Sequence, residues 1–150
     1  MSRVVPDKVY QKYAWLILFV VGLLTVLSSP IGLLGNPPNP PSAEGTTGLS
    51  LDQIASRVPG IMDYIGSISR QLGNFMLGFG VLTTAIAAVP YRKGEKWSWY
   101  ASWVLPVFVL IQLVNSNWGY LWQLDFAFMF LVLAGLVLPY RKFFPKKQSA

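Results

Sequence analysis

The sequence predicts an all-α integral membrane protein: a four-transmembrane-helix bundle made of two helical hairpins, plus a short extracytoplasmic amphipathic helix. Three observations predict it: long apolar runs, charged residues confined to the gaps between them, and aromatic residues at their edges. Of the 150 residues, 53% are hydrophobic and 12% are charged, whereas soluble domains carry about 25% charged residues. We therefore expect one membrane domain over residues 1–150.

Four apolar runs are long enough to cross a bilayer. A hydrocarbon core of about 30 Å requires about 20 apolar residues in a helix. The expected spans are residues 13–34, 65–89, 97–114 and 118–138. The first run is too long for the core of a signal peptide and lacks a clear cleavage site after it, so we interpret it as a retained span.

The lysines and arginines predict the orientation of these spans. If the spans alternate, ten of the twelve basic residues lie on one side, and only Arg57 and Arg70 lie on the other. We therefore expect a multi-pass protein of the cell membrane with both termini and the loop at Gly94 in the cytoplasm. The net charge of +6 suits anionic lipid headgroups, because the basic residues border the apolar runs, and we expect no nucleic-acid partner.

The extracytoplasmic loop covers residues 35–60 and opens with a proline-rich stretch, which favours a stiff, extended connector. Further on, Ser50 as N-cap and Gln53 three residues later form a plausible capping box. Leu51 and Ile54 then fall on one helical face. We predict a short amphipathic helix that lies on the outer membrane surface or caps the bundle, and that ends at Pro59.

Small residues mark the expected contact faces between helices, because association within lipid depends on close packing. They form one stripe in each of the first two spans, and we predict that these stripes meet. The residues are Gly22, Thr25, Ser29 and Gly32 in the first span and Gly66, Gly73, Gly80 and Ala87 in the second. In the third span, Pro106 should bend the helix, with Ser102 helping to satisfy the local backbone.

Polar side chains gather in the outer halves of the spans, and Asp125 is the most informative of them. It lies about 21 Å from Pro139 along a helix, where an acidic side chain costs on the order of a few kcal/mol. The residues expected around Asp125 are Arg70, Asn74, Gln112, Gln123, Trp118 and Trp122. Three interpretations follow: an outward-facing pocket for a cation or proton, an internal ion pair with Arg70, or a contact with a partner subunit.

The chain contains no Cys and no His, which excludes thiol nucleophiles, Cys- or His-ligated metals and His acid–base catalysis. We expect no catalytic residues, no metal and no cofactor. The leading hypothesis is an accessory or structural subunit of a larger membrane complex, with other membrane subunits or further copies of the chain as partners. The alternative is a small transporter or ligand-binding membrane protein that uses the pocket around Asp125.

The loop at residues 91–100, with sequence YRKGEKWSWY, resembles a loop between spans two and three of small uncharacterised four-transmembrane-helix proteins of bacteria and archaea. The resemblance implies a topology and no activity. The string Pro-Tyr-Arg-Lys also closes both the second span, at Pro90, and the fourth span, at Pro139. Either the two hairpins arose by duplication, or each cytoplasmic helix end independently favours tyrosine and basic residues.

Overall fold

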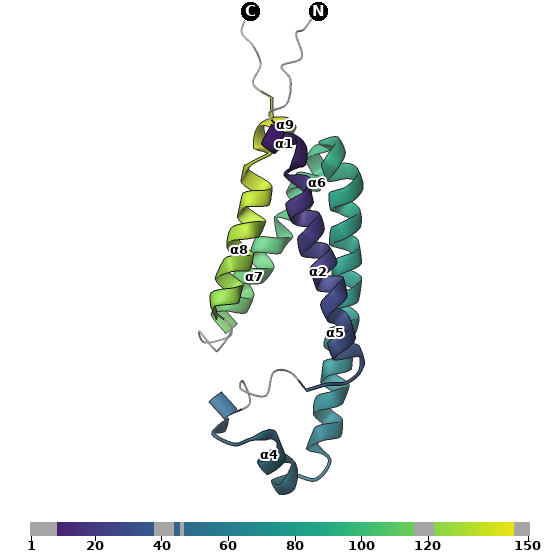
Figure 1. Ribbon diagram of the computed structural model, residues 1–150, viewed down its shortest axis with the longest axis vertical. Helices are drawn as coiled ribbons and strands as arrows, with labels where there is room; N and C mark the ends of the chain where they lie inside the picture. The colour runs from purple at the N-terminus through teal and green to yellow at the C-terminus, as the bar shows by residue number, and fades with distance from the viewer. Residues whose placement is uncertain (1–8, 38–43, 46, 116–121, 146–150) are drawn as a thin grey trace, which may run out of the picture.

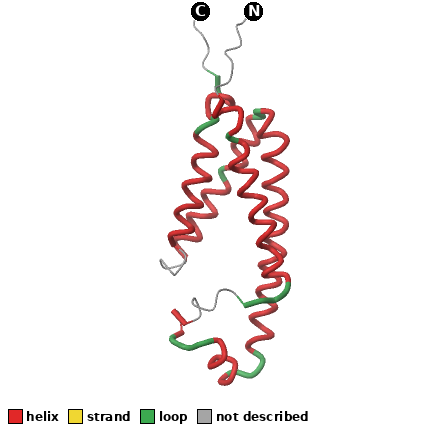
Figure 2. The backbone as a smooth tube through the Cα atoms, viewed as in Figure 1, coloured by secondary structure: helices red, strands yellow, loops and turns green. Residues whose placement is uncertain are grey.

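The computed structural model describes residues 9–37, 44–45, 47–115 and 122–145, and within these ranges the chain is helical apart from short connections (Figure 1, Figure 2). Within the same ranges, four segments are long and apolar enough to cross a membrane, as predicted: Val9–Leu33, Ile61–Tyr91, Lys96–Val114 and Gln123–Phe143. The helices are α1 (Val9–Tyr13), α2 (Trp15–Leu33), α4 (Leu51–Arg57), α5 (Ile61–Ile86), η1 (Ala87–Tyr91), α6 (Lys96–Ser102), α7 (Val104–Asn115), α8 (Trp122–Val137) and α9 (Tyr140–Phe143).

The second span is longer than the predicted 65–89. It begins directly after Gly60, whose positive φ of 79° suits a residue without a side chain, and it continues through the π-turn η1, which contains Pro90. A proline therefore loosens this helix near its end without terminating it. The predicted start of the fourth span at Trp118 and most of the proline-rich connector lie outside the described residues.

Two helical pairs make up the bundle. α2 lies against α5, α7 lies against α8, and α2 also contacts α8. α1 and α9 meet at one end, which also carries Arg92, Lys93 and Arg141 and is called the basic end below. α4 lies at the opposite, distal end, and toward that end the α7–α8 pair diverges from the α2–α5 pair (Figure 1). The halves are therefore joined mainly at the basic end.

Glycines bring α2 and α5 to backbone contact distance, so the two predicted stripes meet. A Cβ atom built on Gly22 would lie 3.1 Å from the carbonyl oxygen of Gly80, and one on Gly32 would lie 2.9 Å from Gly73 Cα. Real Cβ contacts are rarely that short, so only glycine permits this approach. The other buried members of the stripes include Ser29, Gly66 and Ala87.

Pro30 lies inside α2 without interrupting it. A proline has no N–H, so the carbonyl of Val26, one turn earlier, loses its usual helical donor. The Ser29 hydroxyl donates to that same Val26 oxygen at 2.7 Å. A neighbouring side chain thus replaces the missing backbone bond.

The third span is interrupted rather than smoothly bent. α6 ends at Ser102 and α7 begins at Val104, because Pro106 cannot donate to the Ser102 carbonyl. The Ser102 hydroxyl donates to Ser98 O at 2.7 Å, one turn before the break. The predicted disturbance is therefore present, but the break is at Trp103, three residues before the proline that causes it.

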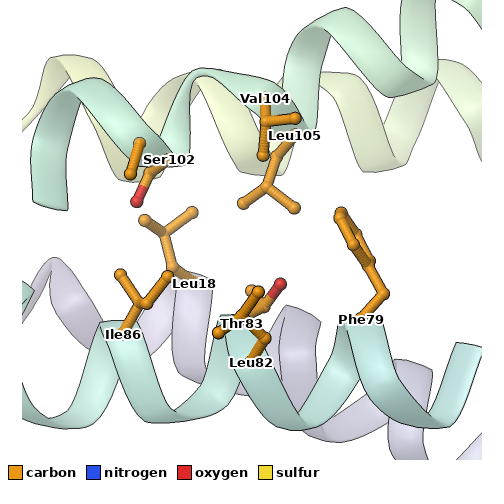
Figure 3. Close-up of a pocket in the computed structure, with 9 residues that line it drawn as sticks. Leu18, Phe79, Leu82, Thr83, Ile86, Ser102, Val104 and Leu105 are labelled. Carbon is orange, nitrogen blue, oxygen red and sulfur yellow. The ribbon is translucent and has the colours of Figure 1, made fainter.

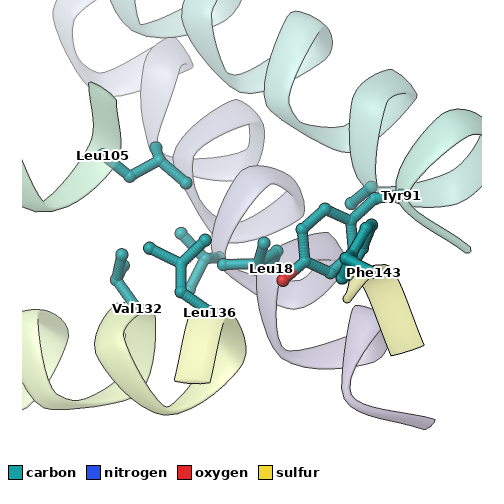
Figure 4. Close-up of a cluster of buried hydrophobic side chains, with 8 residues drawn as sticks. Leu18, Tyr91, Leu105, Val132, Leu136 and Phe143 are labelled. Carbon is teal, nitrogen blue, oxygen red and sulfur yellow. The ribbon is translucent and has the colours of Figure 1, made fainter. Parts of the chain in front are cut away.

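A buried apolar cluster joins the helices at the basic end (Figure 4). Its members are Leu18, Val21, Ala87, Tyr91, Leu105, Val132, Leu136 and Phe143. Tyr91 and Phe143 are in ring contact, with centroids 4.7 Å apart, and the Tyr91 hydroxyl donates to Gly135 O at 2.7 Å. Because Pro139 has no N–H to give Gly135, the phenol supplies the donor that the end of α8 lacks.

Helix α4 begins where the capping box predicted a helix. The Ser50 hydroxyl accepts from Gln53 N at 3.3 Å, and the Gln53 side chain accepts from Ser50 N at 3.0 Å. Leu51 and Ile54 are half-buried, whereas Asp52 and Arg57 are exposed. The less exposed positions of α4 thus carry apolar residues, and its exposed positions include charged ones.

Candidate functional site

Four polar side chains lie at a common distance from the basic end. Measured along the helices, Asn74 is about 25 Å from Tyr91, and Asp125 is about 21 Å from Pro139. Along their own spans, Gln112 is about 24 Å from Lys96 and Gln123 is about 24 Å from Pro139. We call this set, Asn74, Gln112, Gln123 and Asp125, the polar band.

The polar band faces outward from the chain rather than into it. Asn74, Gln112 and Gln123 are exposed, and Asp125 is half-buried. The surrounding surfaces of α7 and α8 are strongly apolar, with Leu110 56% exposed and Leu124 64% exposed. The band is therefore a set of polar groups set into otherwise apolar helix faces.

Among the described residues, Arg70 lies beside the end of α2 and forms no ion pair with Asp125. Its guanidinium lies against the end of α2, where a Cβ built on Gly35 would be 2.7 Å from Arg70 Nη1. Figure 1 shows the physical reason: α5 follows α2, while the end of α8 that carries Asp125 diverges from both. The predicted internal ion pair is therefore absent from the described part of the chain.

Of the other residues predicted around Asp125, Trp118 lies outside the described residues and Trp122 is the first residue of α8. Gln123 adjoins Asp125 on the same helix. Asn74 lies on α5, in the other helical pair. Gln112 lies on α7, which packs against α8. Among the described residues, Gln112, Gln123 and Asp125 thus share the α7–α8 pair, whereas Asn74 and Arg70 belong to α5.

A small hollow lies between α2, α5 and the α6–α7 segment (Figure 3). Its volume is about 30 Å³, roughly the space of one water molecule. The lining residues are Leu18, Phe79, Leu82, Thr83, Ile86, Ala101, Ser102, Val104 and Leu105. Because it is nearly all apolar and so small, it is a packing defect rather than a binding site.

No protein-family model, curated protein or solved structure matches this chain.

A wider hollow lies at the basic end, between α1, the end of α8 and α9, with a volume of about 460 Å³. Its lining residues are Tyr10, Gln11, Val137, Leu138, Tyr140 and Arg141. From the sequence, Tyr10 and Tyr140 are among the aromatic residues expected at the edges of the apolar runs, and Arg141 is among the ten basic residues expected on the cytoplasmic side. The sequence alone does not show that the first and fourth spans bring these side chains together.

Proposed function

We propose that this chain is a non-catalytic subunit of a larger membrane assembly. It would span the cell membrane four times with both termini in the cytoplasm, as the distribution of basic residues favours. Its partners would be other membrane subunits or further copies of itself. They would cover the polar band.

The exposure of the polar band carries this proposal. At the orientation proposed, the band lies within the outer half of the hydrocarbon, where an unpartnered amide costs on the order of 2–7 kcal/mol and where acidic residues are rare. Exposed amides on α7 and α8 would hydrogen-bond across to a neighbouring helix, as polar residues do in membrane interfaces. A partner helix would remove this cost, and a monomer surrounded by lipid would not.

Two further features agree with this role. The chain contains no Cys and no His, so its side chains offer few groups for catalysis. The two helical pairs diverge toward the distal end (Figure 1). On α7, Val107, Leu110 and Ile111 are more than half exposed. A partner seated on α7 beside Gln112 would contact apolar and polar groups together, as a specific interface requires.

The test replaces the amides of the polar band by leucine: Asn74→Leu, Gln112→Leu and Gln123→Leu, combined in one variant. The matched control is Ser28→Val, which removes an exposed hydroxyl about 22 Å from Tyr13, at a similar depth. The Ser28 hydroxyl already donates to Leu24 O at 2.8 Å, so it needs no partner. The readout is co-migration with other polypeptides on native gels after solubilisation in mild detergent.

We expect the control to keep its co-migrating partners and the triple variant to lose them while remaining helical and soluble in detergent. Wild-type protein that migrates as a sharp monomer would overturn the proposal, and so would a triple variant that keeps its partners. A transporter role around Asp125 gives a different pattern: Asp125→Asn would abolish uptake and leave co-migration unchanged.

A further inference from the structure

The hollow at the basic end is an open surface depression large enough to take a lipid headgroup. Its volume of about 460 Å³ falls within the range of about 300–1,000 Å³ that is usual for ligand pockets. It opens on the surface between α1 and α9, which contact each other. It is separate from the polar band, which lies roughly 20 Å further along the helices.

The lining of the hollow divides into an apolar part and a polar part. Val137 ends α8 and Leu138 follows it, with 61% and 42% of their surfaces exposed. Three polar residues lie beyond them, at the basic end of the bundle: Tyr10 on α1, and Tyr140 and Arg141 on α9. An occupant would therefore meet apolar side chains on the bundle side and phenol and guanidinium donors on the terminal side.

The charge of the hollow is positive. Arg141 is exposed and lines it, and none of the six lining residues is acidic. Other basic side chains nearby are held elsewhere: the Arg92 guanidinium lies over the Trp15 ring at 5.1 Å, and Lys142 Nζ donates to Arg92 O at 2.6 Å. Lys12 Nζ lies over the Tyr13 ring at 5.5 Å. Among the described residues, Arg141 is the cation that lines this hollow.

We propose that this hollow binds the headgroup of an anionic phospholipid of the cytoplasmic leaflet. The Arg141 guanidinium binds the lipid phosphate, since its paired N–H groups match phosphate oxygens. The hydroxyls of Tyr10 and Tyr140 donate to the same headgroup, and the first methylenes of an acyl chain lie along Val137 and Leu138. Basic hollows between transmembrane helices on the cytoplasmic side suit anionic lipids, and aromatic rings suit this depth.

The test measures which lipid stays bound when the full-length chain is released from nanodiscs into a mass spectrometer under native conditions. The nanodiscs contain equal amounts of phosphatidylglycerol and phosphatidylcholine. The variant is Arg141→Gln, and the matched control is Lys93→Gln, an exposed cation at the same end that does not line the hollow. Both side chains are exposed, so both variants should fold, which thermal melting in phosphatidylcholine alone verifies.

We expect wild-type protein and Lys93→Gln to retain phosphatidylglycerol over phosphatidylcholine, and Arg141→Gln to lose that preference by about five-fold, the effect of one cation near an anionic lipid. Equal retention by the two variants would overturn the proposal, as would a wild-type protein without preference. Adding glycerol 3-phosphate as a competitor tests whether the hollow binds a soluble phosphate ester rather than a lipid. Failure to displace the lipid supports the proposal, and displacement at millimolar concentration would assign the hollow to a soluble phosphate ester instead.

Discussion

The close approach of α2 and α5 makes a quantitative prediction at Gly73. Adding one methyl group by Gly73→Ala would place its Cβ against Leu33 N, 2.8 Å from Gly32 C and 3.0 Å from Ser29 O. These are backbone atoms of a packed helix, so they cannot rotate away as a side chain would. The two helices must separate by roughly 0.5–1 Å, an overpacking that costs about 1–3 kcal/mol.

Gly78→Ala is the matched control on the same helix. A Cβ there meets nothing within 4 Å, so the change should only improve helix propensity, by up to about 1 kcal/mol. That gain applies to Gly73→Ala as well and partly offsets its clash. We therefore expect the two variants to differ by about 1–3 kcal/mol in the free energy of unfolding, with Gly73→Ala the less stable.

Equilibrium unfolding of the two variants in mixed detergent micelles, followed by circular dichroism and tryptophan fluorescence, measures this difference. Parallel changes in both signals would support a single transition. Gly73→Ala as stable as Gly78→Ala would refute the backbone contact between α2 and α5 and, with it, the packing on which the fold depends.

Three smaller perturbations test other contacts, by the same unfolding measurement unless stated. Tyr91→Phe removes the hydrogen bond that caps α8 and should cost about 1–2 kcal/mol, whereas Tyr140→Phe, at an exposed tyrosine, should cost little. Ser29→Ala removes the donor to the Val26 carbonyl, which Pro30 cannot replace. It should lower the free energy of unfolding by about 1–3 kcal/mol, more than Ser28→Ala does. Ser50→Ala removes one half of the capping box and should cost α4 about 1 kcal/mol, seen as faster amide exchange in its first turn; unchanged exchange would contradict the cap.

Local patterns in the sequence predict much of the fold. The apolar runs predict the long helices, because a run of about 20 apolar residues is typical of a helix that can cross a bilayer. The seven-residue repeat of Gly66, Gly73 and Gly80 predicts which face of α5 packs, because small side chains are what close approach requires. Ser50 and Gln53 predict the start of α4, because capping is a contact between residues three apart.

Contacts between distant residues are less predictable. Arg70 and Asp125 look like an ion pair because their charges are opposite and their depths similar. Which helices are neighbours at that depth depends on how far the two helical pairs diverge. The Arg70 side chain lies against the end of α2 instead. Matching local sequence does not fix burial either: in the repeated Pro-Tyr-Arg-Lys string, Tyr91 is 1% exposed and Tyr140 is 49% exposed.

The central claim, that the four apolar helices lie in a bilayer with the basic end in the cytoplasm, is tested most directly by labelling single cysteines. The chain has none of its own, so Ser56→Cys on α4 and Lys93→Cys at the basic end each report one position, and both positions are exposed. We predict that a membrane-impermeant maleimide labels Ser56→Cys on intact cells and labels Lys93→Cys only after permeabilisation. Equal labelling of the two positions on intact cells would contradict the account.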